Sequence, residues 1–348
     1  MHRLDLNDVI DHNPSEILAA APDALALAMG AHVHAPHPFA DAVARAPLRT
    51  AALAAGLLLN PRQPGENEIA VFGRGIRASQ FAGAVAAGLQ SAARVKYDMQ
   101  AGYIAGVAQV EITKLGLPVP LGALDVVAPL EGVGDGMEYG IAPASLSDGE
   151  SVTLSTYGRI LGLTRQAIYN DEHALIQDAV AATGTAAARL EARLIAAALE
   201  GTGNMSDGSP VFHASHANVS AVAFDAAGLA AAVAAVRKQP AADGEALDAA
   251  AAVLFVAADL EYSAHKLVRD SGLPLAVVTL AGLAAGRYYV AASPDVARTI
   301  AVGRLEGATH PLRVEPVKTP ISYDGAMVRV SIDTAAAMLG RRGIVRGG

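Results

Sequence analysis

Apolar and polar positions follow two different periods along the chain, and the period changes with position. In the first hundred residues apolar side chains recur every three or four positions, which is typical of amphipathic helices. This pattern predicts helices over residues 14–29, about 39–59 and 79–99. Ser15 is expected to cap the first of them. The run Asn-Pro-Arg-Gln-Pro-Gly at 60–65 interrupts the pattern and marks a candidate boundary.

Residues 115–153 have a different character, because Gly, Pro, Val and Asp dominate there. Short strand-like pieces lie between turn residues, so the segment predicts a long extended hairpin. A connection of this length with little packing of its own is usually functional or disordered.

The second half of the chain alternates between strand and helix patterns. We expect a strand at 154–164 and a long helix at 171–200, kinked at Thr183-Gly184. Tyr323-Asp324-Gly325 is expected near the turn between the last two strands. The remaining expected elements are helices at 225–237, 259–267 and 293–300 and strands at 251–257, 275–280, 288–292, 312–317 and 326–332. This order predicts an α+β fold rather than a regular βαβ repeat.

Composition narrows the possible functions. The 348 residues are 52% hydrophobic but only 4% aromatic, and alanine supplies the surplus. The net charge of −8 argues against general affinity for nucleic acid, which needs basic patches. The absence of cysteine excludes disulfides and thiolate metal sites. The first residues lack the apolar stretch of a signal peptide, and no uncharged apolar run is long enough to span a membrane, so no membrane partner is expected.

Histidines offer the only candidate chemistry, and each cluster has a simpler explanation. His213 and His216 have the spacing of a metal pair, but no third ligand is evident nearby. Ser215, His213 and Asp207 could form a hydrolytic triad on paper, but no G-x-S-x-G motif is present. Histidines in such a turn-rich loop are more often structural or surface groups. We therefore predict no catalytic, cofactor-binding or metal-binding residue.

Two further patterns are explained more simply as structural features than as binding sites. His32, His34 and His37 lie among prolines, which favours a solvated connector over a metal site. The glycine clusters at 73–75 and 132–136 are not followed by Lys-Ser/Thr and do not stand between a strand and a helix, so neither is a nucleotide-binding loop. Flexible turns are expected at both.

Acidic residues gather in the expected hairpin, and arginines follow it. Glu131, Asp135 and Glu138 could form a solvated face or could meet arginines of a neighbouring subunit. Arg159 and Arg165 are the expected partners, since arginine binds carboxylates at interfaces through its planar fork. These five residues are the candidate assembly interface.

Several segments together resemble the major capsid proteins of tailed phages. The resemblance is to the group related to fusions of a prohead protease with a major capsid protein and to Mu-like major head subunits. The residues that carry it are 156–159, 163–168, 170–171, 186–191, 205–208, 212–214, 216–218, 288–291 with Pro294, 305–307, and 324–325 leading to 342–343. Residues 1–76 fit least well, and no protease nucleophile motif lies in them.

The resemblance implies an HK-97-like fold, which is α+β. In that fold an N-terminal arm leads to an extended hairpin called the E-loop, a P-domain carries a long spine helix, and an A-domain lies at the capsomer centre. The implied boundaries are an N-terminal helical arm or scaffold-like segment at 1–76, the arm helix and lead-in at 77–114, the E-loop at 115–153, the P-domain with the spine helix at 154–221, the A-domain at 222–310, and the closing P-domain strands at 311–348.

The implied function is structural: self-assembly into hexamers and pentamers of an icosahedral shell around packaged double-stranded DNA. Other copies of the chain are the expected partners, with portal, scaffold and cement proteins as further candidates. The shell would be assembled in the bacterial host cytoplasm and would form the virion capsid. An encapsulin-like compartment shell is the first alternative, and a hydrolase is the alternative of a different class. Some capsids of this fold are cross-linked through an E-loop lysine, but residues 115–153 contain none, so we expect no covalent cross-links.

Overall fold

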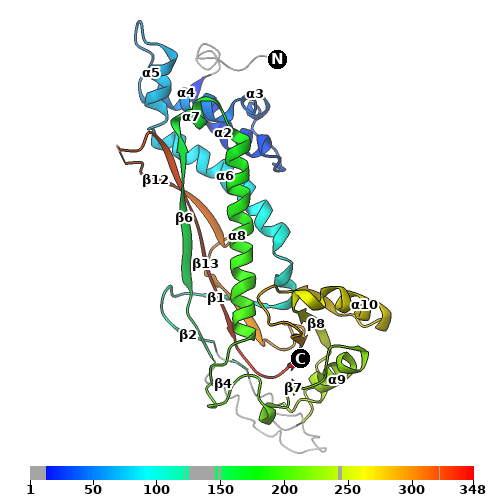
Figure 1. Cartoon of the computed structure of the whole chain (residues 1–348). Coiled ribbons are helices and arrows are strands. Elements are labelled where there is room, and N and C mark those ends of the chain that lie inside the picture. The colour runs from blue at the N-terminus through cyan, green and yellow to red at the C-terminus, as the bar shows by residue number, and fades with distance from the viewer. Residues whose placement is uncertain (1–12, 122, 125–145, 148–149, 242–244, 321) are drawn as a thin grey trace, which may run out of the picture. The chain divides into compact units, whose positions relative to one another are not determined.

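A computed structural model describes residues 13–121, 123–124, 146–147, 150–241, 245–320 and 322–348. The chain divides into two compact units. Unit 1 comprises Met1–Gln100, Thr156–Ala188 and Thr309–Asp333, and unit 2 comprises Ala101–Ser155, Arg189–Ala308 and Thr334–Gly348. Both units contain helices and strands, which confirms the predicted α+β class (Figure 1).

Unit 1 combines a helical cluster with three paired strands. Its helices are α2 (Pro14–Ala28), α3 (Ala40–Val43), α4 (Pro47–Leu59), α5 (Glu68–Gly75), α6 (Ser79–Gln100), α7 (Arg165–Tyr169) and the first part of α8 (His173–Leu199). Its strands are β6 (Ser155–Thr164), β12 (Leu312–Val317) and the first part of β13 (Gly325–Met338). The later residues of α8 and β13 belong to unit 2.

The helices of unit 1 form a packed core rather than an extended arm. Helix α2 packs against α4 and α6, and α4 packs against α5. The buried side chains include Ile17, Leu25, Leu53, Phe72 and Leu89. Burial of this apolar surface is the main force that holds the cluster together.

Three local expectations for these helices are corrected. The cap of α2 is Asn13, whose side chain accepts a hydrogen bond from the Ser15 amide, with Pro14 at the start of the helix. The helix expected at 39–59 is divided, because α4 begins anew at Pro47, which fits the first turn of a helix. The glycine cluster at 73–75 is not a turn but the last part of α5.

The glycine at the end of α5 has a packing role. A Cβ at Gly75 would lie 1.7 Å from the carbonyl oxygen of Ala52, and one at Gly56 would lie 2.2 Å from that of Val71. Helices α4 and α5 can therefore approach this closely only with glycine at both positions.

The strands of unit 1 pair in a simple order. Residues 327–332 of β13 pair antiparallel with β12, in a register that places Arg313 opposite Ser331 and Glu315 opposite Arg329. β6 also pairs with β13. Helix α6 packs against β12. The strands expected at 154–164 and 312–317 agree closely with β6 and β12, whereas β13 begins at Gly325 and is longer than the expected 326–332.

Unit 2 is built around a second sheet, ordered β7-β14-β10-β8-β9. Helix α9 packs against β14, β10 and β8, and α10 packs against β9. The core includes Leu229, Val236, Leu254, Tyr288 and Val345. The elements concerned are β7 (Val219–Ser220), α9 (Ala226–Lys238), β8 (Ala251–Val256), α10 (Glu261–Ser271), β9 (Ala276–Thr279), β10 (Tyr288–Ala292) and β14 (Ile344–Gly347).

Other strands of unit 2 include the ends of the expected hairpin. Val119 pairs with Val152, and Ala123 pairs with Ser147, both in antiparallel ladders, as a hairpin requires. Residues 125–145 lie outside the described residues. The remaining elements are η1 (Gly102–Gly106), β1 (Ala108–Ile112), β2 (Val119–Pro120), β3 (Ala123–Leu124), β4 (Leu146–Ser147), β5 (Ser151–Val152), η2 (Ala214–His216), η3 (Ala258–Leu260) and β11 (Ile300–Leu305).

One further expectation is wrong. The helix expected at 293–300 is absent: those residues form turns and extended chain that lead into β11. Helix α8 is continuous from His173 to Leu199, and the kink expected at Thr183-Gly184 stays a prediction. Gly184 permits a close helix contact within unit 1, because a Cβ there would lie 2.3 Å from the carbonyl oxygen of Ala93.

Candidate assembly surface

The two faces of the β12–β13 pair differ in polarity because successive residues of a strand point to opposite sides. One face is apolar and buried, and it includes Leu312, Val314, Val328, Val330 and Ile332.

The opposite face carries the charged and hydroxyl side chains. It presents Arg313 and Glu315 from β12, and Arg329, Ser331 and Asp333 from β13. We call it the arginine face.

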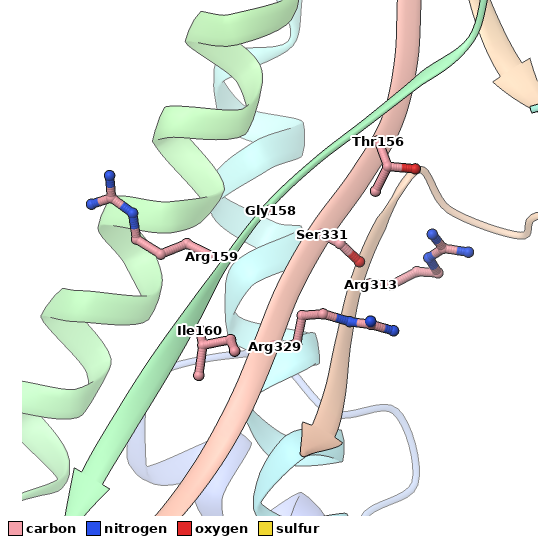
Figure 2. A pocket seen from close by; sticks show the side chains of 7 residues that line it. All are labelled: Thr156, Gly158, Arg159, Ile160, Arg313, Arg329 and Ser331. Carbon is pink, nitrogen blue, oxygen red and sulfur yellow. The ribbon is translucent and has the colours of Figure 1, made fainter. Parts of the chain in front are cut away.

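A pocket of about 450 Å³ lies on the arginine face (Figure 2). Strand β6 supplies one wall, where Thr156 and Ile160 point to the same side as Arg313 and Arg329. Arg159 lies between Thr156 and Ile160 in the sequence, and its guanidinium is directed away from those of Arg313 and Arg329. The residues lining the pocket are Thr156, Gly158, Arg159, Ile160, Arg313, Arg329 and Ser331.

Two ion pairs occupy the arginine face. Asp333 is buried and accepts hydrogen bonds from the Thr156 hydroxyl, at 2.6 Å, and from the Arg313 guanidinium. Glu315 and Arg329 form an exposed pair, with 2.6 Å between Nη2 and Oε2. This hydrogen bond from Arg329 holds the pKa of the Glu315 carboxyl below its usual value.

Two buried donors on this face have no partner among the described residues. They are the Ser331 hydroxyl and the Nε–H of Arg313. The two residues are directly opposite each other in the antiparallel register. Buried polar groups are usually hydrogen-bonded, so this pair requires an explanation.

The predicted interface residues fall into three places. Arg159 is exposed on β6 and has no ion-pair partner in the described part of the chain. Arg165 lies beside Asp324 of its own chain, with 3.7 Å between Nη1 and Oδ2, and its amide donates to the Asp324 carbonyl. Glu131, Asp135 and Glu138 lie outside the described residues, so their pairing with these arginines stays a prediction.

Residues 204–218 of unit 2 form a loop that contains His213 and His216, and we call it the histidine loop. Internal hydrogen bonds close it. His216 Nε2 lies 2.9 Å from Asp207 Oδ2, and its Nδ1 lies 2.9 Å from the Val211 carbonyl oxygen. Asn218 is buried and also donates to the Val211 carbonyl, at 2.7 Å. The Ser209 amide, with help from Arg341, holds the pKa of Asp207 below its usual value.

These contacts do not assemble the triad that the sequence allows on paper. His213 Nδ1 lies 2.7 Å from the Ser215 hydroxyl, but Asp207 contacts the other histidine, His216. Within the described ranges no group of three or more His, Cys, Asp or Glu side chains could hold a metal ion. The loop therefore has the contacts of a structural element.

The other histidine cluster is similarly tied to its surroundings. His37 Nε2 lies 3.3 Å from Glu16 Oε2, and the His37 amide donates to Asp23 at 2.8 Å.

Among the described helices, none is both long and apolar enough to cross a membrane.

The arginine face was missed by the sequence analysis, although a signal was present. Arg-Val-Glu at 313–315 and Arg-Val-Ser-Ile-Asp at 329–333 alternate polar and apolar residues. Such alternation in two neighbouring strands predicts one polar face. The alternation does not show the register of β12 and β13, which places these polar residues next to one another.

Comparison with known proteins identifies the class of protein. The family model for phage capsid protein matches residues 149–347, which include strands β5 to β14, helix α8 and the histidine loop. The match spans more than half of the chain, so the chain belongs to the phage capsid protein family. It is a structural protein of the capsid. Curated protein sequences contain no significant match.

Solved structures show a weaker similarity. A virus-like particle from Pyrococcus furiosus has 11% identity and a TM-score of 0.46, covering 75% of this chain and 97% of its own. The head of a Helicobacter pylori bacteriophage has 10% identity and a TM-score of 0.45, covering 70% and 86%. Mycobacterium phage Bobi has 13% identity and a TM-score of 0.44, covering 71% and 89%.

Proposed function

We propose that this protein is the major capsid subunit of a tailed phage or phage-like particle, and that copies of it self-assemble into hexamers and pentamers of an icosahedral shell. The observation that carries the proposal is the family match over residues 149–347. No enzymatic role is proposed. The shell would enclose double-stranded DNA without sequence-specific contacts and would use portal, scaffold and cement proteins as further partners.

The proposed organisation is the HK-97-like one. The E-loop would occupy 115–153, the spine helix would be α8, and the A-domain would occupy 222–310. The antiparallel ends of the hairpin and the 27-residue length of α8 support this assignment. The N-terminal segment 1–76 would be an added part. Its helices α2, α4 and α5 have buried side chains and pack into a core.

We further propose that the acidic hairpin contacts Arg159 of a neighbouring subunit. Residues 115–153 contain six carboxylates and no lysine or arginine. Arg159 is exposed, and no carboxylate of the described residues pairs with it. Complementary charge of this kind selects partners and fixes their register.

Electron microscopy of the purified protein tests the assembly proposal. Closed particles or capsomers are the expected result, and a monomer at all protein and salt concentrations would contradict it. Particles that contain a protein cargo instead of DNA would favour the compartment alternative. Boiling the particles in detergent should release one band near 35.3 kDa, since the hairpin has no lysine for a cross-link.

Charge reversal tests the Arg159 contact separately. Arg159→Glu should block assembly while the isolated subunit unfolds at an unchanged denaturant concentration, because Arg159 has no partner within the described chain. Glu131→Arg or Glu138→Arg in the same chain should partly restore assembly. Arg269→Glu, on the exposed face of α10, is the matched control. Normal particles from Arg159→Glu would remove this contact from the proposal.

A further inference from the structure

Two buried donors on the arginine face have no acceptor in the described part of the chain. Both oxygens of Asp333 already accept, one from Thr156 and one from Arg313. The Ser331 hydroxyl and the Arg313 Nε–H are unpaired in the described chain. Ser331 is only 3% exposed, and it lines the pocket. A molecule that enters the pocket therefore has to bring acceptors.

We propose that this pocket is a carboxylate-binding site. One carboxylate oxygen would accept from the Ser331 hydroxyl and the other from the Arg313 Nε–H. The two donors belong to directly opposite residues of neighbouring strands, which lie close enough for one ligand to reach both.

The charges on this face favour a singly charged ligand. Asp333 and Glu315 already balance Arg313 and Arg329, so a singly charged ligand meets less repulsion from these two carboxylates than a phosphate dianion would. The pair between Arg329 and Glu315 is exposed and contributes little stability, so Arg329 can turn part of its guanidinium toward a ligand.

The pocket also has room and an apolar wall for a carbon chain. Its volume of about 450 Å³ lies in the range of small-ligand sites. The side chain of Ile160 is 54% exposed and faces the same side as Arg313. The ligand class is thus a small organic carboxylate, whether free or carried by an acidic side chain of a second copy.

Binding of acetate to the dispersed subunit tests the site without reference to assembly. Melting temperature is measured as acetate is added, with sodium chloride at equal ionic strength and with acetamide as the uncharged isostere. A saturable rise with acetate alone is expected. Ser331→Ala and Arg313→Lys should abolish the rise, since the first removes the hydroxyl and the second removes the Nε–H while keeping the charge. Ser263→Ala and Arg269→Lys, on the exposed part of α10, should leave it intact.

The outcomes separate this site from the proposed function. No response to acetate, an equal response in Ser331→Ala, or a larger response to phosphate would each overturn the carboxylate assignment, even if particles form. A response that persists in assembled particles would support a free ligand. A response that disappears on assembly, together with weaker assembly of Ser331→Ala, would support a side chain of a second copy. If no particles form, the result for the dispersed subunit still decides the site.

Discussion

Arginine–carboxylate pairs occur in two contrasting regions of this molecule. In unit 2 the carboxylate of Glu191, on α8, is completely buried, and Arg304 of β11 binds it through both terminal nitrogens. Tyr103 donates to the same carboxylate at 2.8 Å, and Arg304 also reaches Thr334. In unit 1 Asp333 is buried but its partner Arg313 is partly exposed, and both members of the pair between Arg329 and Glu315 are about half exposed.

The difference shows what burial does to the same chemistry. Removing a charge from water costs several kcal/mol, and only complete pairing and hydrogen bonding offset that cost. The Glu191 cluster is multiply bonded and ties α8, η1, β11 and β13 together within unit 2. The arginine face keeps its charges near water and leaves donors unused, which suits a surface that receives something. A graded set of substitutions tests this contrast.

The largest effect is expected at Glu191. Glu191→Ala leaves the Arg304 guanidinium without its buried counter-ion, and we expect a loss of about 3–5 kcal/mol of unfolding free energy. Urea denaturation of the dispersed subunit measures it. The double variant Glu191→Leu with Arg304→Met removes both charges and should recover much of the loss. A single variant as stable as the natural chain would break the contrast between the two regions.

Asp333 should give an intermediate effect, because its carboxylate is buried while its partner Arg313 is about one third exposed. Asp333→Ala leaves the Thr156 hydroxyl and the Arg313 guanidinium without their acceptor, at an expected cost of about 1–3 kcal/mol. The same urea experiment applies, with Asp270→Ala on exposed α10 as control. A loss as large as that at Glu191 would mean that the arginine face is as closed as the interior.

Arg329 should have a smaller effect on the subunit. Both members of its pair with Glu315 are about half exposed, and such pairs contribute about 0–1 kcal/mol. Arg329→Ala is therefore expected to shift the urea midpoint only slightly, and added salt should reduce even that shift. A cost above about 2 kcal/mol would contradict the description of this pair as a surface contact.

The smallest effect is the pH dependence of the same pair. The folded-state pKa of Glu315 is lowered, mainly by the hydrogen bond from Arg329. Its contribution is thus fully present above the ordinary pKa, about 4.3, and is lost as the pH falls through the lowered value. Glu315→Gln should reduce the slope of stability against pH slightly below about pH 4.3, and it should leave the slope at pH 7 unchanged. Flattening at neutral pH instead would require a different titrating group.

The sequence predicted the elements best where one local signal was strong. The range of β10 follows directly from an apolar run, that of β12 from alternating polar and apolar residues, and that of α6 from its helical period. Prediction failed at Ser293–Ile300, where a Ser-Pro-Asp helix start is followed by too little apolar surface to pack a helix. The sequence also did not show that Gly184 contacts Ala93, ninety-one positions earlier in the chain.

At the candidate site, too, the sequence predicted which residues matter but not which contacts they make. The sequence pointed to Arg159 and Arg165 by their position after an acidic segment, but it did not show that Arg165 lies beside Asp324 or that Arg159 points away from Arg313 and Arg329. It also allowed Asp207 to serve His213, whereas the loop closes on His216.

By itself the sequence determined the α+β class, the absence of cysteine chemistry, the acidic character of the hairpin and the resemblance to phage capsid proteins. Each of these follows from residue types or from a hydrophobic period that is visible within a short stretch of the sequence. Only the tertiary structure decided which charges are buried, which are paired and which donors stay unused. Those properties depend on strand register and on the burial of side chains far apart in the chain, and register and burial are set by packing of the whole unit rather than by any local pattern.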